Sequence, residues 1–192
     1  MITAIDRNTA RAWAEIDLSV IRKNYLSACD YAARHGAAVM AIMKANAYGH
    51  GAERVALELE RYCGAKYYAV ATLDEALELT GAGIDSKILI LSEVHPSLYG
   101  ELCHRSNIMT SIFRYESAKK LSEAASRAGV CAEYFLAVDT GMSRIGFEFT
   151  TDEKQSASLD EIVKINALPN LECAGIFSHY ACPDERDKTS AL

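Results

Sequence analysis

The sequence predicts an α/β fold built on a parallel sheet, and three observations support this prediction. Short apolar runs alternate with amphipathic segments of helical periodicity along most of the 192 residues. The apolar runs show little alternation between polar and apolar positions, which is typical of strands covered on both faces. Hydrophobic residues make up 50% of the chain, enough for one sizeable core, so residues 1–192 are treated as one domain.

Six apolar runs are expected to form strands, and both faces of each are expected to be buried. In chain order these runs are Ala37–Met43, Lys66–Val70, Lys87–Leu91, Asn107–Ile112, Glu133–Val138 and Leu171–Phe177.

Five segments between these runs are expected to form helices. They are Leu18–Ala33, Glu53–Tyr62, Thr72–Thr80, Glu116–Ala128 and Asp152–Ala167. Several helix ends carry recognisable signals. Thr72 is a suitable N-cap followed by acidic residues, and Gly129 and Pro169 stand where helices are expected to stop.

Six βα units in succession indicate most of a TIM-type (β/α)8 barrel, here incomplete with about six of the eight strands. Two strands are then expected to be missing, and an open barrel exposes two strand edges, a known route to self-association. A flavodoxin-like sheet needs only five strands and is the alternative. Composition and periodicity do not separate these two folds.

Charge and hydropathy exclude several classes of function. The net charge of -6 offers no basic surface for polyanions, so nucleic-acid binding is not expected. No apolar run approaches the roughly 20 residues that span a bilayer, and the polar start lacks the apolar stretch of a signal peptide. A cytoplasmic protein without membrane contact is expected.

The six cysteines are scattered without any C-x-x-C spacing, which indicates reduced thiols rather than a disulfide framework. Cys173, His179 and Cys182 could suggest zinc, but structural zinc sites usually draw four ligands from paired short spacings. No second pair accompanies these three residues, so no metal site is expected.

The strongest local signal is the segment MKANAYGHG, residues 43–51. The run Ala37–Met43 delivers Lys44 to its carboxyl end, where α/β folds place their active sites. A lysine amine there can form a covalent bond with a carbonyl group, and the glycine-containing loop after it can approach a phosphate, with Tyr48 as donor. On spacing alone, a lysine that extends into solvent before a flexible turn is the more ordinary interpretation.

The string KANAYGHG, preceded by Ala-Ile-Met, resembles the cofactor-lysine signature of the alanine racemase family. Four further stretches match that family in the right order and cover nearly the whole chain. They are RAWAEIDL (residues 11–18), ATLDEA (71–76), VDTGMSRIGF (138–147) and GIFSHYA (175–181). Several long motifs in one order are far more specific than any one of them.

The resemblance implies a pyridoxal 5'-phosphate (PLP) enzyme that interconverts L-alanine and D-alanine for peptidoglycan synthesis. Lys44 would hold PLP covalently and act as acid or base on one face of the substrate's α-carbon. Tyr48 would hydrogen-bond the cofactor phosphate. Arg144 would contact the cofactor's ring oxygen and the substrate carboxylate, which suits its fixed fork of donors. His179 would lie beside the pyridine ring.

Without the resemblance, Arg144 fits a surface charge equally well, and His179 fits a hydrogen-bonded structural residue better. Two positions also depart from the family. Many relatives carry a lysine, often carbamylated, where this chain has Ala137, and that lysine is thought to position the nearby arginine. Ser143 stands where glycine or asparagine is common.

In the family a C-terminal β-domain supplies the second base, a tyrosine that acts on the partner subunit's cofactor. The last two barrel strands supply further phosphate contacts and an arginine that faces the pyridine nitrogen. Since neither part is present, this chain is expected to be a truncated piece with little turnover alone. The family forms head-to-tail homodimers, and weak or altered self-association is predicted here.

Two alternatives stay open at this stage. A related group of single-domain barrel proteins binds PLP without established turnover, although those proteins lack the extended KANAYGHG string. Serine or broad-specificity racemases related to vancomycin resistance would keep the fold and change the substrate.

Overall fold

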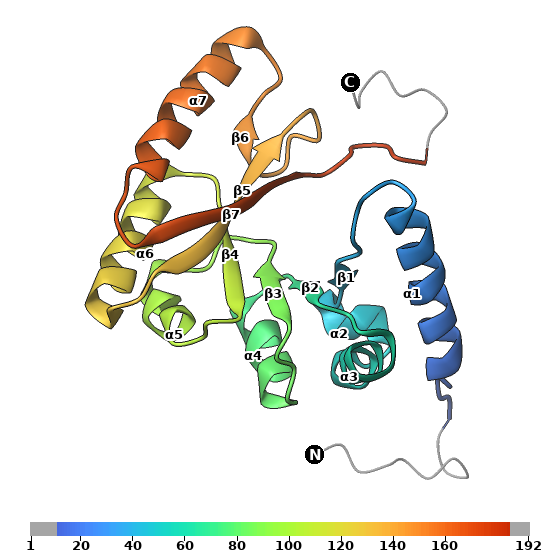
Figure 1. Ribbon diagram of the computed structural model, residues 1–192. Coiled ribbons are helices and arrows are strands. Elements are labelled where there is room, and N and C mark those ends of the chain that lie inside the picture. The colour runs from blue at the N-terminus through green and yellow to red at the C-terminus, as the bar shows by residue number, and fades with distance from the viewer. Residues whose placement is uncertain (1–10, 185–192) are drawn as a thin grey trace.

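The computed structural model describes residues 11–184 as a curved parallel sheet with an outer layer of helices (Figure 1). The first half contains α1 (Leu18–Ala33), β1 (Ala41–Ile42), α2 (Lys44–Gly49), α3 (Ala52–Cys63), β2 (Tyr67–Val70), α4 (Leu73–Gly81) and β3 (Lys87–Ile90). The second half contains η1 (Pro96–Leu98), α5 (Tyr99–Cys103), β4 (Ile108–Ile112), α6 (Tyr115–Ala128), β5 (Ala132–Asp139), β6 (Phe147–Glu148), α7 (Asp152–Asn166) and β7 (Leu171–Ser178).

The order of the strands decides between the two folds that the sequence left open. Strands β1 to β5 pair in chain order, and β7 pairs with the side of β5 that faces away from β4. Every pairing is parallel. A flavodoxin-like sheet reverses its direction at a switch point, so its strands do not follow chain order. The sequential order is that of a (β/α)8 barrel, and the predicted incomplete barrel is confirmed.

Both outer strands of the described sheet have one open edge, because β1 pairs only with β2 and β7 only with β5. The strand predicted over Ala37–Met43 is too long. Strand β2 begins at Tyr67 and pairs only with Ala41 and Ile42 of this run. The prediction that both faces of every strand are buried is wrong for β7, which contains no buried residue.

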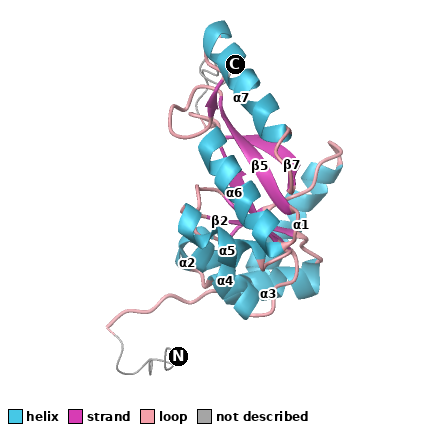
Figure 2. Ribbon diagram, turned by 90° about the vertical axis from the view of Figure 1, so that its left-hand side faces the viewer, coloured by secondary structure: helices cyan, strands magenta, loops and turns pink. Residues whose placement is uncertain are grey.

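The two faces of the sheet carry apolar layers of unequal size. The larger core lies between the sheet and the helices, where Ile90 and Ile112 are fully buried. The inner face carries a small cluster of Ala69, Leu89 and Met109. Figure 2 shows the helices as a layer outside the strands. This arrangement leaves the inside of the curved sheet available for a ligand.

Five helices lie where the sequence predicts them, with ends that differ by at most one residue from the prediction. The predicted N-cap is confirmed, because the Thr72 hydroxyl accepts a hydrogen bond from the Glu75 amide. The predicted helix stop at Gly129 is confirmed as well, since this residue ends α6 in the left-handed conformation that glycine adopts readily.

Three features of the fold were not predicted from the sequence. The first is the turn α2 directly after β1. The second is the pair formed by η1 and α5, which begins at Pro96. The third is β6, a two-residue strand that pairs with the end of β5. All three lie after the carboxyl ends of strands, in segments too short for a clear periodic pattern.

Two contacts hold α3 in place, one to helix α1 and one to strand β2. Arg22 of α1 forms an ion pair with Glu58 of α3 at 3.1 Å. The buried Tyr68 hydroxyl of β2 donates a hydrogen bond of 2.9 Å to the Ala56 carbonyl of α3. Burial raises the pKa of Tyr68, so this hydroxyl keeps its proton and remains a donor.

Within residues 11–184, no helix combines the length and the apolar character needed to cross a membrane. All six cysteines carry free thiols.

A bulge shapes the pairing of β5 with β7. Tyr134 pairs with Cys173 and Phe135 with Gly175, so Ala174 is an extra residue in β7. The Phe135 ring packs directly against Gly175, where an added Cβ atom would lie 2.5 Å from the ring. Glycine at position 175 therefore allows β7 to pack closely against this ring inside the curved sheet.

We expect Gly175→Ala to lower the free energy of unfolding by about 1–3 kcal/mol, because the Phe135 ring must move. Urea denaturation measures this change. Gly100→Ala is the matched control, since a Cβ atom there meets nothing within 4 Å. Combining Gly175→Ala with Phe135→Leu should cost less than the two separate losses together. Strictly additive losses would show that contact with Phe135 is not the cause.

Candidate active site

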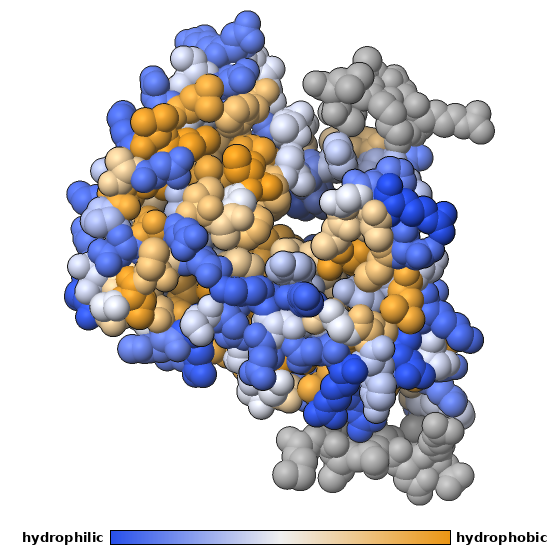
Figure 3. Space-filling view, viewed as in Figure 1, coloured by the Kyte–Doolittle hydropathy of each residue, from blue (hydrophilic) through white to orange (hydrophobic). Residues whose placement is uncertain are grey.

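A cavity of about 450 Å³ opens at the carboxyl ends of the strands, where (β/α)8 barrels place their active sites. Figure 3 shows the molecule hollowed between the part that carries α1 and the part that carries α7, with apolar side chains beside the hollow. The cavity lining comes from β1, α2, the residues after β2 and β3, β5 with the loop that follows it, and β7. Segments far apart in the sequence therefore meet at one place.

All four side chains predicted for the site line this cavity: Lys44, Tyr48, Arg144 and His179. Lys44 is half-buried, while the other three are exposed. The structure thus brings together an amine, a phenol, a guanidinium and an imidazole at one opening.

The turn α2 has an unusual backbone. Ala45, Asn46, Ala47 and Tyr48 all lie in the left-handed region, with φ between 51° and 55°. For L-residues this conformation costs roughly 1–2 kcal/mol each, so four in succession cost about 4–8 kcal/mol. Such strain persists only where the surrounding structure holds it, and it is concentrated at functional sites.

Side-chain hydrogen bonds hold this left-handed turn at both ends. The Ala45 amide donates to the Glu75 carboxylate at 2.7 Å, and the Ala52 amide donates to the Asn46 side-chain oxygen at 2.8 Å. His50 Nδ1 lies 2.8 Å from the Ala47 carbonyl, which can only accept, so this nitrogen carries a proton. The turn is therefore held by Glu75 of α4 and also by hydrogen bonds among residues 46–52.

The left-handed turn sets the positions of Lys44 and Tyr48 relative to each other. Lys44 Nζ lies 5.8 Å from the centre of the Tyr48 ring, within the range of a cation–π contact. Both residues line the cavity, and Tyr48 is 62% exposed.

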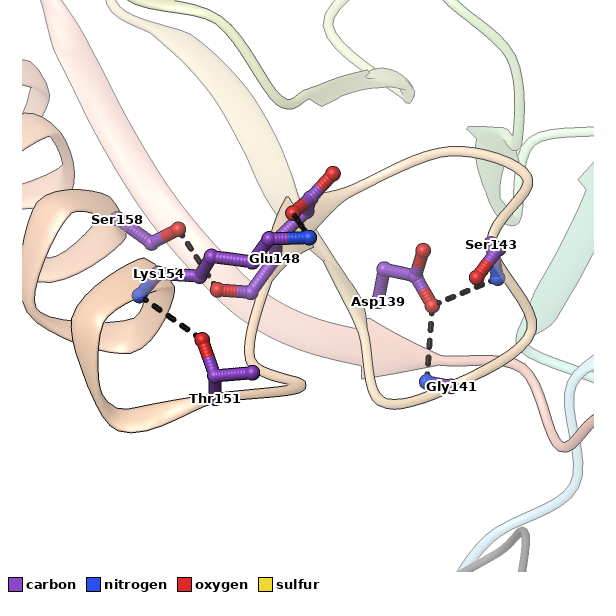
Figure 4. A network of polar contacts seen from close by, with 7 residues as sticks. All are labelled: Asp139, Gly141, Ser143, Glu148, Thr151, Lys154 and Ser158. Carbon is purple, nitrogen blue, oxygen red and sulfur yellow. Dashed lines mark hydrogen bonds and ion pairs between the residues drawn. The ribbon is translucent and has the colours of Figure 1, made fainter.

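Arg144 stands in the loop between β5 and β6, and Asp139 shapes this loop. The buried Asp139 carboxylate accepts hydrogen bonds from the Gly141 amide at 2.9 Å and the Ser143 amide at 3.0 Å (Figure 4). Ser143 has a φ of 58°, a left-handed conformation directly before Arg144. Gly146 closes the loop so tightly that a Cβ atom there would lie 2.7 Å from the Asp139 nitrogen.

The far side of this loop is tied to α7 through β6. The Ser158 hydroxyl donates to the Glu148 carbonyl at 2.9 Å, and Lys154 forms an ion pair with the Glu148 side chain at 2.6 Å (Figure 4). The hydrogen bond to Glu148 raises the pKa of Lys154. Because the Lys154 and Glu148 side chains are both about half exposed, their ion pair contributes little to stability.

Position 137, where many relatives carry lysine, is an alanine with 1% exposure that lines the cavity. Its methyl group cannot hydrogen-bond Arg144. The contacts that shape the arginine loop in this chain are instead those that Asp139 makes to the loop backbone. Asp139 therefore fixes the backbone of the loop that carries Arg144.

His179 follows β7 directly and lines the same cavity as the lysine turn. The residue before it, Ser178, shares a hydrogen bond of 2.7 Å with Thr140 of the arginine loop. This bond links the end of β7 to the segment that carries Arg144. Among residues 11–184, no group of three His, Cys, Asp or Glu side chains is placed to hold a metal ion.

Sequence reasoning missed several polar residues of the site, namely Ser92, Asp139 and Ser178, which line the cavity, and Glu75, which holds the lysine turn. The three cavity residues share a signal, since each lies at or just after the end of an apolar strand. Glu75 also carries a signal, because Thr72 and Glu75 form the T-x-x-E pattern of a capping box. No sequence pattern predicts the hydrogen bond that the Glu75 carboxylate accepts from the Ala45 amide.

We expect Asp139→Ala to loosen the arginine loop, because the Gly141 and Ser143 amides lose their shared acceptor. The free energy of unfolding should fall by about 1–3 kcal/mol. Both amides should exchange with deuterated water faster than in the unaltered chain, which NMR measures residue by residue. Asp139→Asn is the control, since its side-chain oxygen still accepts, and its effect should be smaller. Unchanged exchange in Asp139→Ala would rule out this role.

Known proteins resemble this chain in sequence over most of its length. Residues 16–191 match the family described as "Alanine racemase, N-terminal domain". The alanine racemase of Clostridium tetani is 43% identical over 178 residues, which cover 92% of this chain and 43% of that protein.

Solved structures give the same result. The alanine racemase of Clostridium difficile 630 superposes with a TM-score of 0.85 at 33% identity, over 95% of this chain and 46% of that one. The histidine racemase of Leuconostoc mesenteroides superposes with a TM-score of 0.69 at 28% identity, over 88% of this chain and 44% of that one. The chain spans less than half the length of these relatives, and it belongs to the alanine racemase family.

Proposed function

We propose that this chain forms the cofactor-binding part of a PLP-dependent alanine racemase. The observation that carries the proposal is the meeting of Lys44, Tyr48, Arg144 and His179 at one cavity. The family membership supports it, because the relatives named above include alanine racemases at up to 43% identity.

The residues of the cavity fit PLP in size and in chemistry. A volume of about 450 Å³ lies in the range of small-ligand sites. Ile42, Leu91 and Phe177 supply apolar walls that suit an aromatic ring. The Lys44 amine suits the aldehyde of PLP, and the hydroxyl of Tyr48 suits its phosphate.

Each predicted side chain then has a task in this proposal. Lys44 would hold the cofactor covalently through Nζ, and Tyr48 would donate a hydrogen bond to the phosphate. Arg144 would bind the substrate carboxylate with two parallel N–H groups. His179, at the end of β7, would lie beside the ring and restrict its movement.

Bound PLP supplies an electron sink that stabilises negative charge at the α-carbon of an amino acid. Lys44 Nζ, freed when the amino group of the substrate takes its place on the cofactor, would take the proton from this carbon, or return it, on one face. Inversion needs a second acid or base on the opposite face. We propose that this group comes from a partner subunit in a homodimer, as in the resemblance described above, and that the complete enzyme works in the cytoplasm.

Alanine is the substrate that most of the relatives' names indicate. A related amino acid is the second candidate, because a histidine racemase superposes on this chain with a TM-score of 0.69. The cavity lining that this chain supplies near the α-carbon is the same in either case, since Lys44 and Arg144 act on groups that every α-amino acid shares.

The direct test is loading with PLP followed by reduction with borohydride and mapping of the labelled peptide. We expect a visible absorbance band on addition of PLP and a stable pyridoxyl label on Lys44. Lys44→Ala should abolish both signals. Lys66→Ala, which alters an exposed lysine at the opposite end of β2, should change neither. A label spread over surface lysines would contradict the proposal.

A second measurement on the loaded chain separates catalysis from simple binding. Exchange of the α-hydrogen of alanine for deuterium from the solvent needs only one base, so Lys44 alone suffices. We expect slow exchange detectable by NMR in the absence of racemisation. Specific labelling of Lys44 without any exchange would favour a PLP-binding protein without turnover.

A further inference from the structure

Glu75 belongs to the stretch ATLDEA (residues 71–76), but the resemblance described above implies no task for it in the site. It is the third residue of α4, and its amide is capped by Thr72. It does not line the cavity, but its carboxylate is half-buried between α4 and the lysine turn. A carboxylate in that place needs hydrogen-bond donors, and the backbone supplies them.

The two carboxylate oxygens of Glu75 have different partners. Oε2 accepts from the Ala71 amide at 2.7 Å and the Thr72 amide at 3.2 Å, both at the start of α4. Oε1 accepts from the Ala45 amide at 2.7 Å, 30 residues away in the sequence. One side chain therefore joins the end of β2, the start of α4 and the lysine turn.

Helix capping does not explain the contact made by Oε1. A capping box needs the bond from Glu75 to the Thr72 amide, and Oε2 makes it. The bond between Oε1 and Ala45 adds nothing to α4. It fixes the peptide plane directly after Lys44, at the first of the four left-handed residues.

We propose that Glu75 is a positioning residue for Lys44, acting through the Ala45 amide. The hydrogen bond holds the left-handed turn from outside, and so fixes the direction in which the lysine side chain leaves the backbone. The consequence for the cofactor rests on the function proposed above. The structural part, that Glu75 holds this turn, does not depend on it.

The test compares Glu75→Gln with Thr72→Ala in the full chain. Glutamine keeps the size of the side chain but replaces one accepting oxygen by an NH2 group, so it cannot serve both sets of amides. Thr72→Ala removes the hydroxyl that caps α4 and leaves the carboxylate in place. Amide hydrogen exchange at Ala45 and at Leu79 of α4 is measured by NMR without cofactor.

Glu75→Gln should speed exchange at Ala45 about tenfold, the factor expected when a hydrogen bond to a charged group is lost. Exchange at Leu79 should change less. In Thr72→Ala, exchange at Leu79 should speed up more than exchange at Ala45. With PLP added, the dissociation constant of Glu75→Gln should rise about tenfold, while that of Thr72→Ala stays near the original value.

Unchanged exchange at Ala45 in Glu75→Gln would overturn the proposal. Equal acceleration at Ala45 and Leu79 in both variants would also overturn it, because a capping role alone then explains the result. If the unaltered chain does not bind PLP, the proposed function fails, and the exchange data still decide whether Glu75 holds the turn.

Discussion

The backbone enters the left-handed conformation at Ala45, shortly after β1, and keeps it through Tyr48. The rest of the site depends on how this turn is held. A right-handed turn in the same place would leave Lys44 and Tyr48 in a different relation to the cavity. Four left-handed residues are unfavourable by themselves, since only glycine adopts this conformation freely. The hydrogen bonds that Glu75 and Asn46 accept from backbone amides offset part of that cost.

The second loop of the site follows the same plan. Asp139 accepts two backbone amides in the loop before Arg144, as Glu75 accepts amides around the lysine turn. Among the described residues, every non-glycine residue with positive φ lies in one of these two loops, with Asn170 as the exception. Strain is thus concentrated in the segments that carry Lys44, Tyr48 and Arg144, and buried or half-buried carboxylates hold it there.

The sequence predicted the barrel units well, for physical reasons, and the four residues predicted for the site line one cavity. Long apolar runs and helical periodicity indicate which residues are buried, and each βα unit of the barrel repeats the same pattern of burial. The length of β1 was overestimated because strand length depends on the partner, and β2 pairs with only two residues of that run. The left-handed turn and the bond between Glu75 and Ala45 could not be predicted, since each depends on contacts made only after folding.

The most direct test of this account is the change in the free energy of unfolding that Ala45→Gly causes. The sign of this change reports whether the turn is left-handed or right-handed. Ala45 is exposed, so little packing is lost. At a left-handed position glycine relieves strain, and we expect no loss of stability or a gain of up to about 1 kcal/mol. Ala28→Gly, exposed within α1, should lose about 1 kcal/mol as the right-handed control. An equal loss in Ala45→Gly would contradict the left-handed turn.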